Sequence, residues 1–132
     1  MKPRLGLCVA SLLMALAANA SAGPGDSPLG YSDFGFATRC DDDRARLTQL
    51  EEIACSSASL RDQEVRMLNL VDDVRNETRG VDGETGKAID PMGAQQKAWR
   101  DDLARECKDA VCLSVAYAAR IAAIHKEWSQ GL

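Results

Sequence analysis

Histidine and aromatic side chains are scarce in this chain. Its 132 residues include one histidine, His125, and two each of phenylalanine, tryptophan and tyrosine. A lone histidine provides no pair of imidazoles for a zinc site, and no serine or cysteine nucleophile motif surrounds it. We therefore expect no enzyme activity, cofactor or metal, and we place His125 at the surface near a helix C-terminus. With so few aromatic rings, the core must be built mainly from aliphatic side chains.

A basic excess is also missing. The chain carries 16 Lys and Arg residues against 20 Asp and Glu residues, which gives a formal net charge of −4. Binding to nucleic acid requires basic surface that neutralises phosphates, so we expect no nucleic-acid partner. An acidic domain is better matched to a basic protein, because complementary charge accelerates the encounter of two proteins.

Only one long hydrophobic run is present, and it lies near the N-terminus. The run 5–18 follows two basic residues and precedes small residues that fit cleavage after Ala22 or Ala20. This pattern is typical of a secretory signal peptide, which we assign to residues 1–22. The run is too short to span a bilayer comfortably, and an uncleaved anchor is the alternative. We expect a periplasmic or secreted protein with no stable membrane insertion after cleavage.

Signal cleavage changes both the charge and the size of the chain. It removes Cys8, Lys2 and Arg4, which leaves 14 of the 16 basic residues against all 20 acidic ones and a net charge of −6. About 110 residues remain, which suits one domain. Residues 23–35 are rich in Gly, Ser, Pro and Asp and predict a flexible lead-in. The folded domain is expected over residues 36–132.

Helical periodicity dominates this domain, and no alternating strand pattern is visible. The capping-box sequence Thr48-Gln49-Leu50-Glu51 indicates one helix start, and Pro91 suits the first position of another. The expected helices are 48–55, 60–79, 91–106 and 111–128, with a glycine-rich loop over 80–91. The run Asp41-Asp42-Asp43 is a competing start for the first helix. We predict an all-α fold, a small bundle of about four helices stapled by two disulfides.

The four remaining cysteines, Cys40, Cys55, Cys107 and Cys112, supply the expected staples. In an oxidising compartment they are most simply two disulfides. Of the three possible pairings we prefer Cys40–Cys55 with Cys107–Cys112. Residues five apart on one continuous helix lie about 7.5 Å apart along its axis, which is too far for a bridge. The second pair therefore requires a break between two helices, with Asp109 as a plausible cap. Zinc is the weaker alternative, because the cysteine spacings are not compact.

Three charged segments could suggest a catalytic or ligand-binding site, but each has a simpler explanation. The stretch 80–87 is similar to a phosphate loop, but Ala88 stands where a Ser or Thr is needed and no strand precedes it. Asp82 and Glu84 could form a carboxylate pair for acid–base catalysis, but a mobile loop holds no fixed separation between them. The acidic run 41–43 could bind a cation and is better explained as a solvated surface. We assign no catalytic residue and no metal ligand.

An ordered series of cysteine, aromatic, aliphatic and polar residues runs through the expected domain: Phe36, Cys40, Glu52-Ile53-Ala54-Cys55, Leu60, Gln96, Trp99, Cys107, Cys112-Leu113, Tyr117, Arg120 and Ile124. This series resembles the LprI-like lysozyme-inhibitor family of bacterial envelope proteins. The resemblance covers about residues 36–128, and its more specific part runs from Trp99 to Arg120. The chain departs from the family at Glu64, where aspartate is usual, at Val71, where tyrosine is usual, and at Leu103, where a basic residue is common.

The resemblance implies an all-helical, disulfide-bonded envelope domain and, in some members, inhibition of lysozyme. Our main hypothesis is an inhibitor of lysozyme or a related peptidoglycan hydrolase that occludes the substrate cleft. The 80–91 loop is the expected inserting element, with Asp82, Glu84 and Lys87 as partner-binding residues. The alternative is an envelope immunity protein that neutralises a secreted antibacterial effector. A small enzyme or metal-binding protein would need a convergent side-chain cluster, which the sequence does not reveal.

Overall fold

The computed structural model describes residues 28–128, and it contains four α-helices, two short 3-10 turns and one small hairpin. The predicted signal peptide and residues 23–27 lie outside this range. Within it, no helix is both long and apolar enough to cross a membrane. The elements in chain order are η1 Tyr31–Asp33, η2 Arg44–Arg46, α1 Gln49–Ser56, α2 Ala58–Thr78, β1 Gly80–Val81, β2 Ala88–Ile89, α3 Pro91–Glu106 and α4 Ala110–Trp128.

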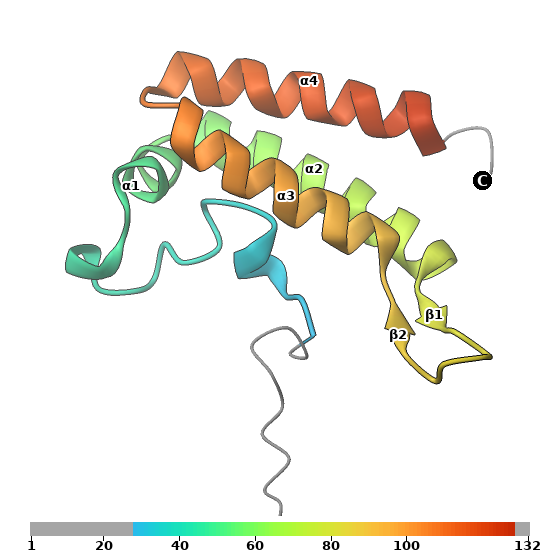
Figure 1. The fold of residues 1–132 in the computed structure, drawn as a ribbon. Helices are drawn as coiled ribbons and strands as arrows, with labels where there is room; N and C mark the ends of the chain where they lie inside the picture. Colours follow the sequence, from blue (N-terminus) through green and yellow to red (C-terminus); the bar gives the residue numbers. More distant parts are fainter. Residues whose placement is uncertain (1–27, 129–132) are drawn as a thin grey trace, which may run out of the picture.

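The three long helices lie alongside one another and form the body of the bundle (Figure 1). The α2 helix packs against all three of the other helices, and its contact with α4 is the most extensive. The short α1 lies at the end where α3 turns into α4, whereas the β1–β2 hairpin projects from the opposite end (Figure 1). The predicted all-α fold is therefore confirmed, with a two-stranded hairpin added to it.

Local capping interactions explain where the helices begin. Thr48 and Glu51 form the predicted reciprocal capping box at the start of α1, which satisfies amides that have no partner within the helix. The Asp90 carboxylate caps α3, and Pro91 occupies its first turn as expected. The Asp109 carboxylate accepts a hydrogen bond from the Cys112 amide at 2.8 Å, so the predicted cap at the α3–α4 corner is also present.

The start of α2 differs from the expectation, and the competing start considered for α1 is not used. The α2 helix begins two residues earlier than predicted because Ser57, whose hydroxyl accepts from the Leu60 amide, is its cap. The acidic run before α1 does not begin that helix. Its last member, Asp43, instead caps the short η2 turn by accepting from the Ala45 amide. A side chain that bonds to an amide two residues ahead favours such a tight turn over a continuing helix.

Both preferred disulfides are present. Cys40 and Cys55 are bonded with their Cα atoms 5.4 Å apart, and Cys107 and Cys112 are bonded with theirs 5.7 Å apart. The first bridge ties the chain before α1 to the end of that helix. The second crosses the corner between α3 and α4, where the helix break that the pairing required is found. Each bridge thus fixes one connection at the same end of the bundle.

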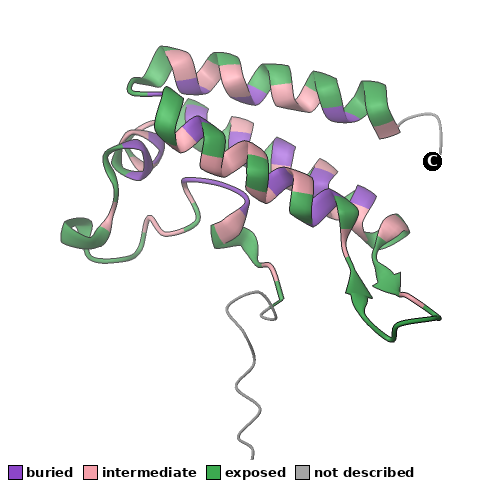
Figure 2. Cartoon of the chain, viewed as in Figure 1, coloured by how far each residue is buried: buried purple, intermediate pink, exposed green. Residues whose placement is uncertain are grey.

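The buried residues lie mainly on the sides of the helices that face one another (Figure 2), and the hydrophobic ones form two adjoining clusters. The first lies toward the disulfide end and is centred on Phe36, Met67, Leu113 and Tyr117. The second lies toward the hairpin, with all its buried members fully enclosed: Phe34, Val71, Val74, Met92 and Ile124. Leu68 is partly buried and packs against both clusters, so they form one continuous core along α2.

The prediction of a flexible lead-in over residues 23–35 is wrong for its last part, residues 29–35, which lie within the described range. Residues 29–37, here called the strap, pack against the bundle, and the Phe34 and Phe36 side chains in the strap are 0% and 1% exposed. Phe34 therefore belongs to the folded domain, whose predicted boundary at residue 36 is too late. Composition suggested flexibility because Gly, Ser and Asp surround these two rings. Burial of the rings removes apolar surface from water and outweighs that local tendency.

A buried carboxylate holds the strap in place. Glu64, on α2, is 2% exposed and accepts hydrogen bonds from the Phe36 and Ala37 amides at 2.5 and 2.8 Å. Its Oε1 atom also accepts from the Tyr117 hydroxyl of α4 at 2.7 Å. Gly35 allows this close approach, because a Cβ atom there would lie 2.6 Å from the Glu64 Cδ atom. One side chain thus joins α2, α4 and the strap.

Two further side chains satisfy carbonyl groups of the strap. Gln96 on α3 donates to the Phe34 carbonyl at 2.9 Å, while its own oxygen accepts from the Arg120 Nε atom at 2.9 Å. Arg100 donates to the Gly35 carbonyl at 2.9 Å. Buried backbone groups left unpaired would cost folding free energy, so these contacts allow an irregular segment to lie inside the core.

Candidate partner-binding hairpin

The segment 80–91, predicted as a loop without strands, contains a short antiparallel ladder. Gly80 pairs with Ile89, and Val81 pairs with Ala88. Beyond the ladder, the Asp82 amide donates to the Lys87 carbonyl at 2.8 Å, and the Gly86 amide donates to the Asp82 carbonyl at 2.9 Å. Two-residue strands are too short to produce a recognisable alternation in sequence, which is why the ladder was missed.

The turn of this hairpin is organised by Asp82. Its carboxylate accepts hydrogen bonds from the Glu84 and Thr85 amides at 2.9 and 2.8 Å. These hydrogen bonds, with Thr85 the largest contributor, lower the pKa of the Asp82 carboxyl below its usual range. Gly86 has a φ angle of 69°, a left-handed conformation that glycine adopts readily. The loop expected to be mobile therefore has a defined hydrogen-bonded shape.

The three residues predicted to bind a partner have different environments. Glu84 and Lys87 are exposed, and their side chains are available to a partner. Asp82 is partly buried, and its carboxylate is engaged within the turn. We therefore assign Asp82 the role of shaping the hairpin, whereas Glu84 and Lys87 are its candidate contact residues.

Sequence reasoning missed the apolar part of this surface. Val81 and Ile89 are 69% and 47% exposed, although both are large hydrophobic residues. They lie on the two strands at the base of the turn. The sequence feature that could have predicted this apolar surface is a pair of isolated Val and Ile residues on either side of a glycine-rich turn. Exposed apolar side chains with charged neighbours are a common feature of protein-binding surfaces.

An ion pair fixes the hairpin to the bundle. Arg75 near the end of α2 donates to the Asp90 carboxylate, with a shortest distance of 2.7 Å, and its guanidinium lies 4.7 Å from the centre of the Phe34 ring. Partial burial of Asp90 opposes ionisation, but hydrogen bonds from Arg75 and from the Gly93 amide outweigh it and lower the pKa of Asp90. The hairpin is therefore anchored where it joins both helices.

A hollow of about 860 Å³ lies at the base of the hairpin. Its apolar wall includes Leu29, Val81 and Ile89, and its cationic side chains include Arg79 and Lys87. It is open to the surface, and its lining also includes the Arg75–Asp90 ion pair. Its chemistry is suited to contact with a protein surface that combines apolar and acidic groups.

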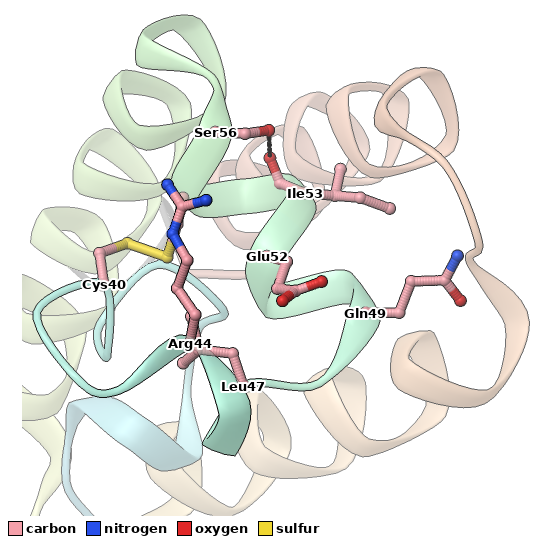
Figure 3. Close-up of a pocket in the computed structure, with 8 residues that line it drawn as sticks. Cys40, Arg44, Leu47, Gln49, Glu52, Ile53 and Ser56 are labelled. Carbon is pink, nitrogen blue, oxygen red and sulfur yellow. Dashed lines mark hydrogen bonds between the residues drawn. A yellow bond between two sulfur atoms is a disulfide. The ribbon is translucent and has the colours of Figure 1, made fainter.

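A second hollow, of about 470 Å³, lies beside the Cys40–Cys55 disulfide and is shown in Figure 3. Arg44 lies in front of the disulfide, and Glu52 projects from α1. Leu47 and Ile53 supply its apolar part. One guanidinium and one carboxylate do not form a catalytic set. Across residues 28–128, no group of three or more His, Cys, Asp or Glu side chains is arranged to hold a metal ion.

Comparisons with known proteins provide no further assignment. No protein-family model, no curated protein and no solved structure matches this chain. The resemblance described from the sequence therefore remains a prediction.

Proposed function

We propose that this chain is an exported inhibitor of lysozyme or of a related peptidoglycan hydrolase. In this proposal the β1–β2 hairpin enters the substrate cleft of the enzyme and blocks it. The main support for this proposal is a projecting hairpin of defined shape, with Glu84 and Lys87 exposed near its tip. Two disulfides suit an oxidising compartment, and the periplasm or the cell exterior is the proposed location.

The dimensions of a hairpin support insertion into a glycan-binding cleft. Neighbouring strands lie roughly 4.8 Å apart, so a two-stranded turn is a narrow element. The hydrogen bonds that the Asp82 carboxylate accepts, together with the left-handed conformation of Gly86, order the turn before binding. Less conformational entropy is then lost on association, because the inserting segment is already shaped.

Charge supports a specific role for Lys87. Most glycoside hydrolases place a pair of Asp or Glu side chains on either side of the bond that they cleave. An inserted ammonium group would pair with these carboxylates and exclude the sugar from them. Glu84 would face basic surface around the cleft, and the acidic balance of the whole chain would accelerate encounter with a basic enzyme.

The test is an inhibition titration with oxidised protein that begins at residue 23. Lysis of a peptidoglycan suspension is followed for several lysozymes at increasing inhibitor concentration. We expect inhibition by the unmodified chain, and a rise of roughly tenfold in the inhibition constant for Lys87→Ala, equivalent to about 1.4 kcal/mol. Lys108→Ala is the matched control, because this exposed lysine lies at the α3–α4 corner, away from the hairpin.

Lack of inhibition of every lysozyme at micromolar concentration would remove this proposal. Equal effects of the Lys87 and Lys108 substitutions on the inhibition constant would contradict the proposed role of the hairpin. The alternative, an envelope immunity protein, would neutralise one secreted antibacterial effector and leave lysozymes active. A pull-down from envelope extract with the oxidised chain separates the two, because it recovers either a hydrolase or a single toxic effector.

A further inference from the structure

The outward face of α4 is unusual because it is apolar along most of its length. The exposed residues between Ala110 and Ala123 are all Val or Ala, and Val111 and Val115 are 75% and 64% exposed. Figure 2 shows α4 exposed along the side that faces away from α2 and α3. We call this surface the α4 face; its members are Val111, Val115, Ala118, Ala119, Ala122 and Ala123.

The outward face of α2 provides a comparison within the same molecule. It also has one well-exposed valine, Val65, at 55%. Its other exposed positions are mainly charged or amide side chains: Arg61, Asp62, Arg66, Asn69, Asp73, Asn76 and Glu77. A solvated helix normally has such a polar outer side. The α4 face lacks it, which indicates that another surface covers this helix.

We infer that the α4 face is the interface of a homodimer in which the α4 helices of two copies lie antiparallel. Closed two-fold dimers are the commonest form of homo-oligomer, and they use the same surface patch on both copies. The α4 face has larger side chains at one end than at the other, and the exposed Asp109 and Lys126 lie at opposite ends of the helix. Both properties favour the antiparallel arrangement.

Side-chain size is the first of these properties. The valines, Val111 and Val115, lie in the N-terminal half of the α4 face, whereas Ala122 and Ala123 lie in the C-terminal half. In an antiparallel pair the valines of one copy meet the alanines of the other, so large and small side chains interdigitate. A parallel pair would place valine against valine at one end and leave a gap between alanines at the other.

Charge is the second property. Asp109 precedes α4, and the exposed Lys126 lies in its last turn. An antiparallel pair with its two-fold axis near Ala118 brings Asp109 of each copy beside Lys126 of the other. The opposed helix dipoles are also favourable in this arrangement. A parallel pair would instead place Asp109 beside Asp109 and Lys126 beside Lys126.

The proposed dimer leaves the inhibitory hairpin of each copy accessible to a target. The Gln95 side chain of α3 donates to Glu127 at 3.0 Å, so the C-terminal end of α4 lies beside the N-terminal half of α3, not far from the hairpin. Pairing through the α4 faces would therefore place the two hairpins at opposite ends of the dimer. A single helix face is smaller than a standard interface of roughly 1,600 Å², so we expect dissociation in the micromolar range.

Sedimentation equilibrium of the oxidised chain tests this inference independently of inhibition. We expect the mass to rise from one copy toward two as the concentration increases through the micromolar range. Val115→Glu should weaken association at least about tenfold, because it places a charge within the contact. Val65→Glu is the matched control on α2 and should leave association unchanged. Circular dichroism of both variants checks that the helices remain folded.

Orientation is tested by a zero-length carbodiimide cross-link on a mixture of ¹⁴N- and ¹⁵N-labelled chains. The antiparallel dimer should give a mixed-isotope peptide that joins Lys126 to Asp109. A dimer that retains full affinity in Val115→Glu, or one cross-linked through other positions only, would contradict the proposed interface. A monomer at every concentration up to about millimolar would overturn it and leave the α4 face to a different protein.

Discussion

The Tyr117 hydroxyl of α4 donates to the Glu64 carboxylate of α2 at 2.7 Å inside the core. The same carboxylate accepts from the two strap amides of Phe36 and Ala37. This arrangement joins the most extensive helix contact of the bundle to its irregular N-terminal segment. Three donors surround one carboxylate, so its removal leaves several buried groups without a partner at once.

The first prediction concerns this buried pair. Tyr117→Phe should lower the free energy of unfolding by about 1–3 kcal/mol, because it removes one hydrogen bond to a charged group. Glu64→Ala should have a larger effect, since both strap amides then lose their acceptor. Urea denaturation measures both, and a double-mutant cycle isolates the coupling between the two side chains. Purely additive effects would contradict a direct interaction.

The second prediction concerns the two disulfides. Loop-closure entropy assigns about 3 kcal/mol to the Cys40–Cys55 bridge and about 2 kcal/mol to the Cys107–Cys112 bridge. Paired Cys-to-Ser variants of each bridge should therefore unfold at lower urea concentration, with the larger loss for the first bridge. Circular dichroism under non-reducing conditions provides the measurement. The opposite order would indicate that contacts around the α3–α4 corner depend more strongly on their bridge.

The third prediction concerns alkaline pH. Burial, followed by the influence of the Glu64 carboxylate, raises the pKa of Tyr117 far above the ordinary value of 10.0. The unfolded chain therefore loses this proton first, and folding stability is fully present below pH 10. It should fall above that pH by up to about 1.4 kcal/mol per pH unit.

Absorbance of tyrosinate and urea denaturation between pH 9 and 12 test this expectation. In Tyr117→Phe the unfolding free energy should fall less steeply with pH, because unfolding then releases about one proton fewer. Tyr31→Phe should retain more of the alkaline loss of stability. Tyr31 is exposed, and its hydrogen bond to Asp72 also raises its pKa. Titration of Tyr117 near pH 10 in the folded protein would contradict its buried environment.

The fourth prediction concerns the hairpin turn. Gly86→Ala should lower stability by about 1 kcal/mol, because an L-residue is disfavoured at a φ angle of 69°. Gly83→Ala is the control, since a Cβ atom there meets nothing within 4 Å and no positive φ is required. If the hairpin inserts into a target, only the Gly86 variant should also raise the inhibition constant. Equal behaviour of both variants in unfolding and inhibition would contradict this role for the turn.

Local chemistry explains what could be predicted from sequence. The start of α1, the bounds of α3 and the cap at Asp109 depend on residues close together in the chain. The preferred disulfide pairing is confirmed, and the reach of a bridge correctly required a helix break between Cys107 and Cys112. These features need no knowledge of distant contacts, because capping and loop closure act over a few residues.

Contacts between distant segments decided the rest. Gln96 and Arg120 are both part of the residue series noted in the sequence, but only the folded chain shows that Arg120 donates to Gln96 and that Gln96 donates to the Phe34 carbonyl. Glu64 has no local signature, and its role depends on strap amides 27 and 28 residues away. The sequence therefore predicted flexibility up to residue 35, although the Phe34 ring lies in the core.

The sequence by itself indicated the four helices, the caps at Thr48 and Asp109 and the preferred cysteine pairing, because each depends on short-range geometry. Only the tertiary structure decided that Asp82 shapes the hairpin while Glu84 and Lys87 remain exposed, and that one side of α4 lies uncovered. Amphipathic spacing indicates which residues face inward. Whether the outward residues meet water or another surface depends on how the remaining helices pack, and that is set by long-range burial.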